Sequence, residues 1–234
     1  TFWYGPVLLV VAVVAWLLLR SVLVKASVRE QMDIFRDKHT WLMTSLYVMT
    51  FGSFSGFSAA FPLLIMSLYG KMPNAPDPLK YAFLGPLIGS AIRVVGGPLS
   101  DKWGGATLTQ ISGIGLLICA LAITPYVEPS SMAQFPPFVA LMLALFFFAG
   151  LGNASTFRQI PVIFSQSPRQ GAGVLGWTAA VAAYGPFVFS TLIGATITAL
   201  GSPKTFFYGA AVFYAINLVI NWWFYARRNA ERPS

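Results

Sequence analysis

Long uncharged stretches, separated by short polar segments, run through the chain as far as about residue 226. Most of these stretches exceed the roughly 18 residues at which an apolar segment becomes a candidate to cross a membrane as a helix. The pattern predicts helices at about 3–24, 41–69, 81–99, 107–127, 138–164, 172–200 and 204–226. The sequence therefore predicts an all-α polytopic membrane protein.

The segments between these helices are polar or rich in turn-forming residues. Residues 25–40 carry charges of both signs and predict a connector. Prolines and an asparagine at 72–78 predict a loop, and 100–105 predicts a tight polar turn that ends the third helix. The helices are therefore expected to be joined mostly by short connections.

Composition supports the membrane class and explains the positive charge. Only 9% of the 234 residues are charged, against about 25% in soluble domains. With the start of the chain placed outside, the inner segments hold ten Lys and Arg residues and the outer loops hold three. This asymmetry predicts a cytoplasmic C-terminus. Since it accounts for the net charge of +8, it removes the reason to expect a nucleic-acid partner.

Residues that usually carry catalysis or bind metals are scarce. The single cysteine, Cys119, lies in an apolar stretch, and the single histidine, His39, lies in the polar connector, where we expect a solvated side chain. The sequence contains no metal-ligand cluster, Ser/His/Asp set, phosphate loop or cofactor motif. We therefore expect no enzyme, no cofactor and no metal, which leaves a membrane enzyme or a structural subunit as the disfavoured alternatives.

Arg93 is the main candidate for chemistry because it lies inside a predicted apolar helix. It shares one helical face with Gly85, Gly89 and Gly97, which are spaced four residues apart. Such glycines allow close approach by a neighbouring helix or a small ligand. A permanent charge within a membrane usually marks a substrate or ion site. No Asp, Glu or His lies in this span, so the compensating charge is either an anionic substrate or a carboxylate elsewhere.

Longer motifs point to a family. The turn that contains Gly97, Asp101 and Lys102 resembles the G-x-x-x-D-R/K-x-G gate loop of the major facilitator superfamily. The segments 51–61, 83–102 and 150–161 resemble the C-terminal half of the bacterial nitrate/nitrite porters, and this resemblance covers essentially the whole chain. It implies a six-helix half-bundle with one extra N-terminal helix.

The resemblance also implies a domain organisation. Residues 1–24 would be the last transmembrane helix of an N-terminal half, and 25–40 the central cytoplasmic loop. Residues 41–226 would form the C-terminal six-helix half, and 227–234 a cytoplasmic tail. The chain starts at Thr1 without an initiator methionine, so we expect it to begin part-way through a larger protein. Its partners would be the missing N-terminal half and the lipid bilayer.

The resemblance assigns roles to individual residues. Arg93 matches the family's substrate arginine in this half, Tyr47 its tyrosine ligand and Phe51 an aromatic that covers the flat anion. Tyr47 and Phe51, one helical turn apart, would otherwise be packing residues. Gly176 opens a segment similar to the second nitrate signature, although Ala182, Tyr184 and Pro186 depart from its usual pattern.

A second set of residues is expected on the substrate path or on its margin. Asn153, Ser155 and Arg158 share an apolar helix that Pro161 bends. Arg158 lies about two turns from the cytoplasmic end, so its side chain either serves the path or extends toward that face.

Chemistry agrees with an oxyanion substrate. Nitrate is flat, weakly hydrated and singly charged, and a guanidinium offers two parallel N–H donors to two of its oxygens. The function expected is nitrate/nitrite exchange by alternating access in a bacterial inner membrane, as part of nitrate assimilation. Proton-coupled nitrate uptake and a major facilitator carrier for another small anion are the alternatives.

Overall fold

The computed structural model describes residues 4–21 and 32–234. The chain divides into two compact units, Thr1–Asp33 and Ile34–Ser234. The first unit contains helix α1 (Tyr4–Ser21), whose apolar stretch Gly5–Leu18 is shorter than the candidate spans of the second unit. The remaining ends of the predicted 3–24 helix, and residues 25–31 of the predicted connector, lie outside the described residues.

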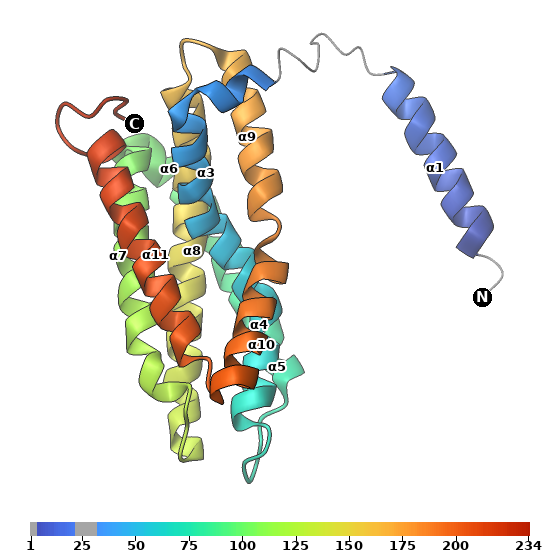
Figure 1. Ribbon diagram of the computed structural model, residues 1–234, viewed down its shortest axis with the longest axis vertical. Helices are drawn as coiled ribbons and strands as arrows, with labels where there is room; N and C mark the ends of the chain where they lie inside the picture. Colours follow the sequence, from blue (N-terminus) through green and yellow to red (C-terminus); the bar gives the residue numbers. More distant parts are fainter. Residues whose placement is uncertain (1–3, 22–31) are drawn as a thin grey trace. The chain divides into compact units, whose positions relative to one another are not determined.

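The second unit consists of helices joined by short connections (Figure 1). Its elements are η1 (Met32–Arg36, which begins in the first unit), α3 (Lys38–Tyr47), η2 (Val48–Gly52), α4 (Ser53–Tyr69), α5 (Pro78–Ala82), α6 (Leu84–Trp103), α7 (Gly105–Ala122), η3 (Thr124–Tyr126), η4 (Met132–Gln134), α8 (Phe135–Ile163), α9 (Pro168–Ala182), α10 (Gly185–Leu200), α11 (Lys204–Asn221) and η5 (Trp222–Ala226).

Six helical segments are long and apolar enough to cross a membrane, judged by length and composition within the described residues. They are Lys38–Tyr69, Pro78–Trp103, Gly105–Tyr126, Met132–Ile163, Pro168–Leu200 and Lys204–Ala226. They coincide with the six predicted spans that follow residue 40. The predicted fold class, an all-α multi-pass membrane protein with a six-helix bundle and an extra N-terminal apolar helix, is confirmed.

Helix α8 forms the centre of the bundle. It packs against α6 on one side and α7 on another, while α11 packs on α7, α4 on α10 and α3 on α9 (Figure 1). Large side chains such as Phe57, Phe61 and Phe146 are fully buried between these helices. Because lipid is as apolar as the core, this close side-chain packing, rather than escape from water, holds the helices together.

Two of the spans are interrupted, and their interruptions meet. The span that begins at α3 passes through a π-helical turn at η2, and the span Pro168–Leu200 breaks between Ala182 and Gly185. At the meeting point Gly185 contacts the backbone oxygen of Gly52, and the Ser55 hydroxyl lies 3.3 Å from the Ala182 oxygen. The predicted continuous helix 172–200 was therefore wrong, because Pro186 starts a new helix after the break.

The predicted tight turn at 100–105 was also wrong. Helix α6 continues through Ser100, Asp101 and Lys102 to Trp103, and the chain changes direction only at Gly104. Gly104 has a φ of 88°, a conformation that residues with a side chain rarely adopt. The polar residues that suggested a loop instead form the last helical turn of α6, so the helix fixes the backbone at Asp101.

His39 is not a solvated loop residue, which corrects the expectation for it. It lies in the first turn of α3, which Asp37 caps through a 2.8 Å hydrogen bond, and only 1% of its surface is exposed. Its ring nitrogens lie 2.9 Å from the Tyr225 hydroxyl and 3.1 Å from a Glu231 carboxylate oxygen. The C-terminal segment folds back over the start of α3 and buries the ring, which local sequence does not reveal.

Candidate functional site

The glycine face of α6 brings this helix close to α8 and α4. A side chain at Gly85 would collide with Phe146, and one at Gly89 would come within 2.5 Å of Phe54. From the other side, Gly150 of α8 packs against the backbone oxygen of Gly89. The spacing of four therefore accommodates neighbouring helices, the first of the two uses that the sequence suggested.

Arg93 follows this contact on α6 and is half-buried. Its guanidinium carbon lies 5.9 Å from the ring centroid of Phe54, a distance at which a cation interacts with an aromatic face. Within residues 4–21 and 32–234, no carboxylate forms an ion pair with Arg93. Its positive charge is thus uncompensated in the part of the chain that the structure describes.

Aromatic side chains form a continuous wall beside Arg93. The ring centroids of Tyr47 and Phe51 are 5.5 Å apart, and those of Phe51 and Phe54 are 6.2 Å apart with nearly parallel planes. Phe157 of α8 extends the wall, 6.3 Å from Tyr47. The π-helical turn η2 contains Phe51, so the helix distortion helps to set the direction of this ring.

A cavity of about 410 Å³ lies beside the guanidinium and is lined by α6 and α8 alone. Its lining residues are Ser90, Arg93, Val94, Gly97, Asn153, Ala154, Phe157 and Arg158. Asn153 is 1% exposed, and neither atom of its amide group has a hydrogen-bond partner. The cavity therefore combines a free cation, an unused amide and an aromatic edge.

Arg158 lines the same cavity, but its guanidinium already has a carboxylate partner. Its Nη1 forms an ion pair with Asp101, which links α8 to the last turn of α6. Gly97 makes room for this contact, since a methyl group there would lie 3.1 Å from Nη2 of Arg158. Of the expected gate motif, Asp101 thus pairs with Arg158 and Gly97 leaves space for its guanidinium. Lys102 is exposed and forms no ion pair in the described chain.

Two of the sequence-predicted residues lie apart from this cavity. Ser155 is fully buried, and its hydroxyl bonds with Thr109 of α7 at 2.7 Å, so it faces the α7–α8 interface. Gly176 lies on an exposed face of α9, and a side chain there would meet nothing within 4 Å. The structure therefore brings Arg93, Asn153, Arg158, Tyr47 and Phe51 together and leaves Ser155 and Gly176 outside.

Sequence reasoning missed Phe54 and Phe157. Phe54 follows Phe51 by three residues and Tyr47 by seven, so helical spacing alone places all three on one face. Phe157 precedes Arg158 in the chain, but its place beside Tyr47 depends on how α8 crosses α3. Only the first of these could have been found without the structure.

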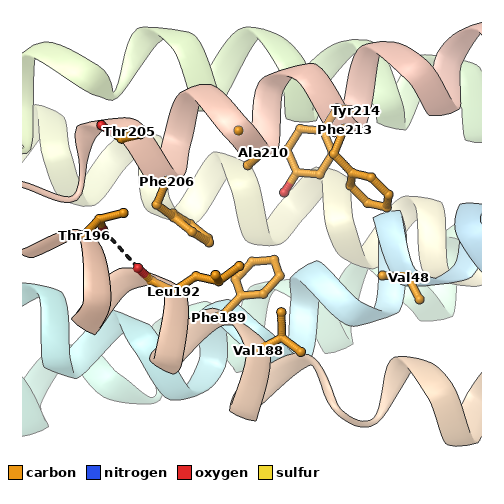
Figure 2. Close-up of a pocket in the computed structure, with 11 residues that line it drawn as sticks. Val48, Val188, Phe189, Leu192, Thr196, Thr205, Phe206, Ala210, Phe213 and Tyr214 are labelled. Carbon is orange, nitrogen blue, oxygen red and sulfur yellow. Dashed lines mark hydrogen bonds between the residues drawn. The ribbon is translucent and has the colours of Figure 1, made fainter. Parts of the chain in front are cut away.

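A second cavity offers a chemical contrast. Figure 2 shows this 400 Å³ cavity between α10 and α11, with Phe189, Phe206 and Phe213 among its walls. The Thr196 hydroxyl bonds back to its own helix at Leu192, and the Tyr214 hydroxyl bonds to Ser53. The cavity is lined mostly by apolar side chains, and none of its described lining residues is charged, so the Arg93 cavity remains the candidate site.

Comparison with known proteins identifies the family of the chain. The chain is 62% identical, over 100% of its length, to the probable nitrate/nitrite antiporter NarK2 of Thermus thermophilus, and 32% identical, over 95% of its length, to the nitrate/nitrite transporter NarU of Escherichia coli (strain K12). The chain belongs to the nitrate/nitrite porter family. A more distant relative, 22% identical over 86% of the chain, is the nitrite extrusion protein of Bacillus subtilis (strain 168). No family model matches the chain.

The match to the porter family is partial in one respect. The chain spans 52% of the length of both NarK2 and NarU. The Arg93 cavity is therefore described from about half of the length that these porters have.

Proposed function

We propose that the protein containing this chain exchanges nitrate and nitrite across a bacterial inner membrane by alternating access, as part of nitrate assimilation. Arg93 carries this proposal, because it is a half-buried cation that no described carboxylate neutralises. In this proposal residues 41–226 form the C-terminal half, 1–24 the last helix of the N-terminal half and 25–40 the cytoplasmic loop between them. The tail 227–234 lies in the cytoplasm.

The proposed binding chemistry follows from the shape of nitrate. The guanidinium of Arg93 donates two parallel hydrogen bonds to two oxygens of the flat anion. The aromatic wall of Tyr47, Phe51 and Phe54 excludes water from one side, and the Tyr47 hydroxyl supplies a further donor. Gly176 approaches the substrate in the complete carrier, where a second half covers the exposed face of α9.

Exchange, rather than free movement of the empty carrier, follows from the cost of burying charge. Closing an empty site strips water from an uncompensated guanidinium, which costs several kcal/mol. A bound nitrate or nitrite offsets that cost, so the carrier changes its facing direction more readily when it is loaded. The relatives' names include an antiporter of nitrate and nitrite, which supports this coupling.

The ion pair between Asp101 and Arg158 is the proposed cytoplasmic gate. It joins the last turn of α6 to α8 at the margin of the cavity, with Gly97 leaving space for the guanidinium and Lys102 beside it in the chain. Asn153 and Arg158 line the way from Arg93 toward this gate, while Ser155 holds α8 against α7. Opening the gate requires the ion pair to separate or move as a unit.

The proposal is tested by reconstituting the full-length protein into liposomes and measuring uptake of labelled nitrate. We expect uptake that depends on nitrite inside the liposomes and that a protonophore leaves unchanged. Excess external nitrite should compete, whereas unrelated organic anions should not. Uptake that needs a proton gradient and no internal anion would support proton coupling instead, and competition by organic anions alone would indicate a carrier for another substrate.

A further inference from the structure

The amide of Asn153 is unusual among the polar groups of the bundle. It is 1% exposed, yet both its nitrogen and its oxygen lack a hydrogen-bond partner. Leaving a buried polar group unpaired costs about 1–3 kcal/mol. Buried polar side chains are nearly always paired in folded proteins, so this amide is available to hydrogen-bond a ligand in the adjoining cavity.

The position of Asn153 shows which other groups a ligand bound to it would also meet. The side chain lines the same cavity as Arg93, which is the uncompensated cation of α6. The Tyr47 hydroxyl is the nearest polar neighbour: it interacts with the Asn153 amide and with the charge of Arg93, although its distance and angle to the amide fall short of a hydrogen bond. Arg158, the other cation of this cavity, is held by Asp101. A ligand at Arg93 is therefore within the surroundings of Asn153 as well.

We infer that Asn153 donates a hydrogen bond from its amide nitrogen to the third oxygen of nitrate and thereby favours nitrate over nitrite. This inference rests on the proposed function. Nitrate has three oxygens, and the guanidinium fork of Arg93 takes two of them. The third oxygen points away from the fork and requires a donor from another element. Nitrite has two oxygens, so it fills the fork and leaves the amide of Asn153 unused.

Neutral charge suits Asn153 to this role. A second arginine here would strengthen the binding of both anions, whereas an amide adds a directional donor without further charge. A site that hydrogen-bonds one substrate discriminates against an analogue that lacks the bonded atom, because its own polar group is then left unpaired. The expected preference therefore concerns the ratio of the two affinities more than either affinity alone.

The test measures dissociation constants for nitrate and for nitrite separately, by calorimetry on the purified full-length protein. We expect Asn153→Ala to weaken nitrate binding about tenfold, since a hydrogen bond to a charged partner is worth about 1.4 kcal/mol or more. Nitrite binding should change much less. Asn153→Ser, which keeps a small donor, should give a ratio between those of the wild type and the alanine variant.

Asn217→Ala provides a matched control. Asn217 is another fully buried asparagine with an unpaired amide oxygen, but it lies on α11 and bonds to Phe213 of its own helix. Its replacement should leave the affinity ratio unchanged. An unchanged ratio in both Asn153 variants would overturn the inference alone. A wild-type protein that binds neither anion would overturn the proposed function.

Discussion

At the scale of single residues, Asp101 and Arg158 connect the cavity to the end of the bundle at which α6 ends. Both side chains are substantially exposed, at 58% and 44%, so their ion pair is expected to contribute less than about 1 kcal/mol to stability. Its value lies in where it is placed, because it fixes α6 against α8 beside the cavity that contains Arg93.

A charge exchange tests this gate. Asp101→Arg and Arg158→Asp should each place like charges together and lower the initial rate of nitrate uptake by the full-length protein. The double variant restores an ion pair with reversed polarity, and we expect it to recover a large part of that rate. Thermal unfolding should differ by only a few degrees among the variants. A double variant slower than both single variants would contradict the gate.

At the scale of helices, the meeting of two interruptions places the aromatic wall. The π-helical turn η2 directs Phe51, and the break after Ala182 lets Gly185 approach the backbone of Gly52. Neither helix could come this close if a side chain stood between them. The contact couples the direction of Phe51 to the positions of α9 and α10.

Gly185→Ala is therefore expected to damage both folding and transport. Its methyl group would collide with the backbone oxygen of Gly52, which cannot move aside as a flexible side chain can. Overpacking of this kind costs about 1–3 kcal/mol, measurable as a lower unfolding temperature of the purified full-length protein. Gly194→Ala on the same helix is the control, since nothing lies within 4 Å of its position. Equal effects of the two substitutions would exclude the Gly52 contact as the cause.

The helical elements were largely predictable, and their ends and breaks were not. Apolar stretches between charges locate the spans because a membrane requires that pattern. The break after Ala182 escaped prediction since Pro186 is also tolerated in transmembrane helices when neighbours satisfy the freed backbone groups. The helical continuation to Trp103 escaped it because Ser100–Gly105 has the composition of a turn.

The residues of the candidate site were likewise only partly predictable from the sequence. Arg93 was predictable as a candidate from its charge within an apolar helix, because no Asp, Glu or His lies in the same span to offset the cost of that charge. The burial of His39 and the contact of Phe157 with Tyr47 depend on segments far apart in the chain. The binding roles of Arg93, Tyr47, Phe51 and Gly176 remain predictions.

At the scale of the whole molecule, the C-terminal segment ties together the ends of several helices. Glu231 bonds to Lys38 at 2.7 Å and to His39 at 3.1 Å, while Arg232 bonds to Asp37 at 2.9 Å. The hydrogen bond from Lys38, and then that from His39, hold the pKa of Glu231 below its usual 4.5. This carboxylate therefore stabilises the folded state in its ionised form.

The pH dependence of stability follows from that lowered pKa. The contribution of Glu231 is fully present above its unfolded pKa of about 4.5 and is lost as the pH falls through the lower value in the folded state. The unfolding temperature of Glu231→Gln should therefore fall less than that of the wild type between pH 7 and about pH 3.5. Lys38→Gln should reproduce part of this change. Identical falls in wild type and Glu231→Gln would show that the ionised Glu231 carboxylate contributes nothing to stability.

The most direct test of the account asks whether Arg93 holds the anion. Full-length protein carrying Arg93→Lys, reconstituted into nitrite-loaded liposomes, keeps the charge but loses the forked pair of donors. We predict a loss of labelled-nitrate uptake of at least about tenfold, which corresponds to about 1.4 kcal/mol, beside a smaller loss for Arg158→Lys. Uptake by Arg93→Lys equal to that of the wild type would contradict the account and make Arg93 a structural residue.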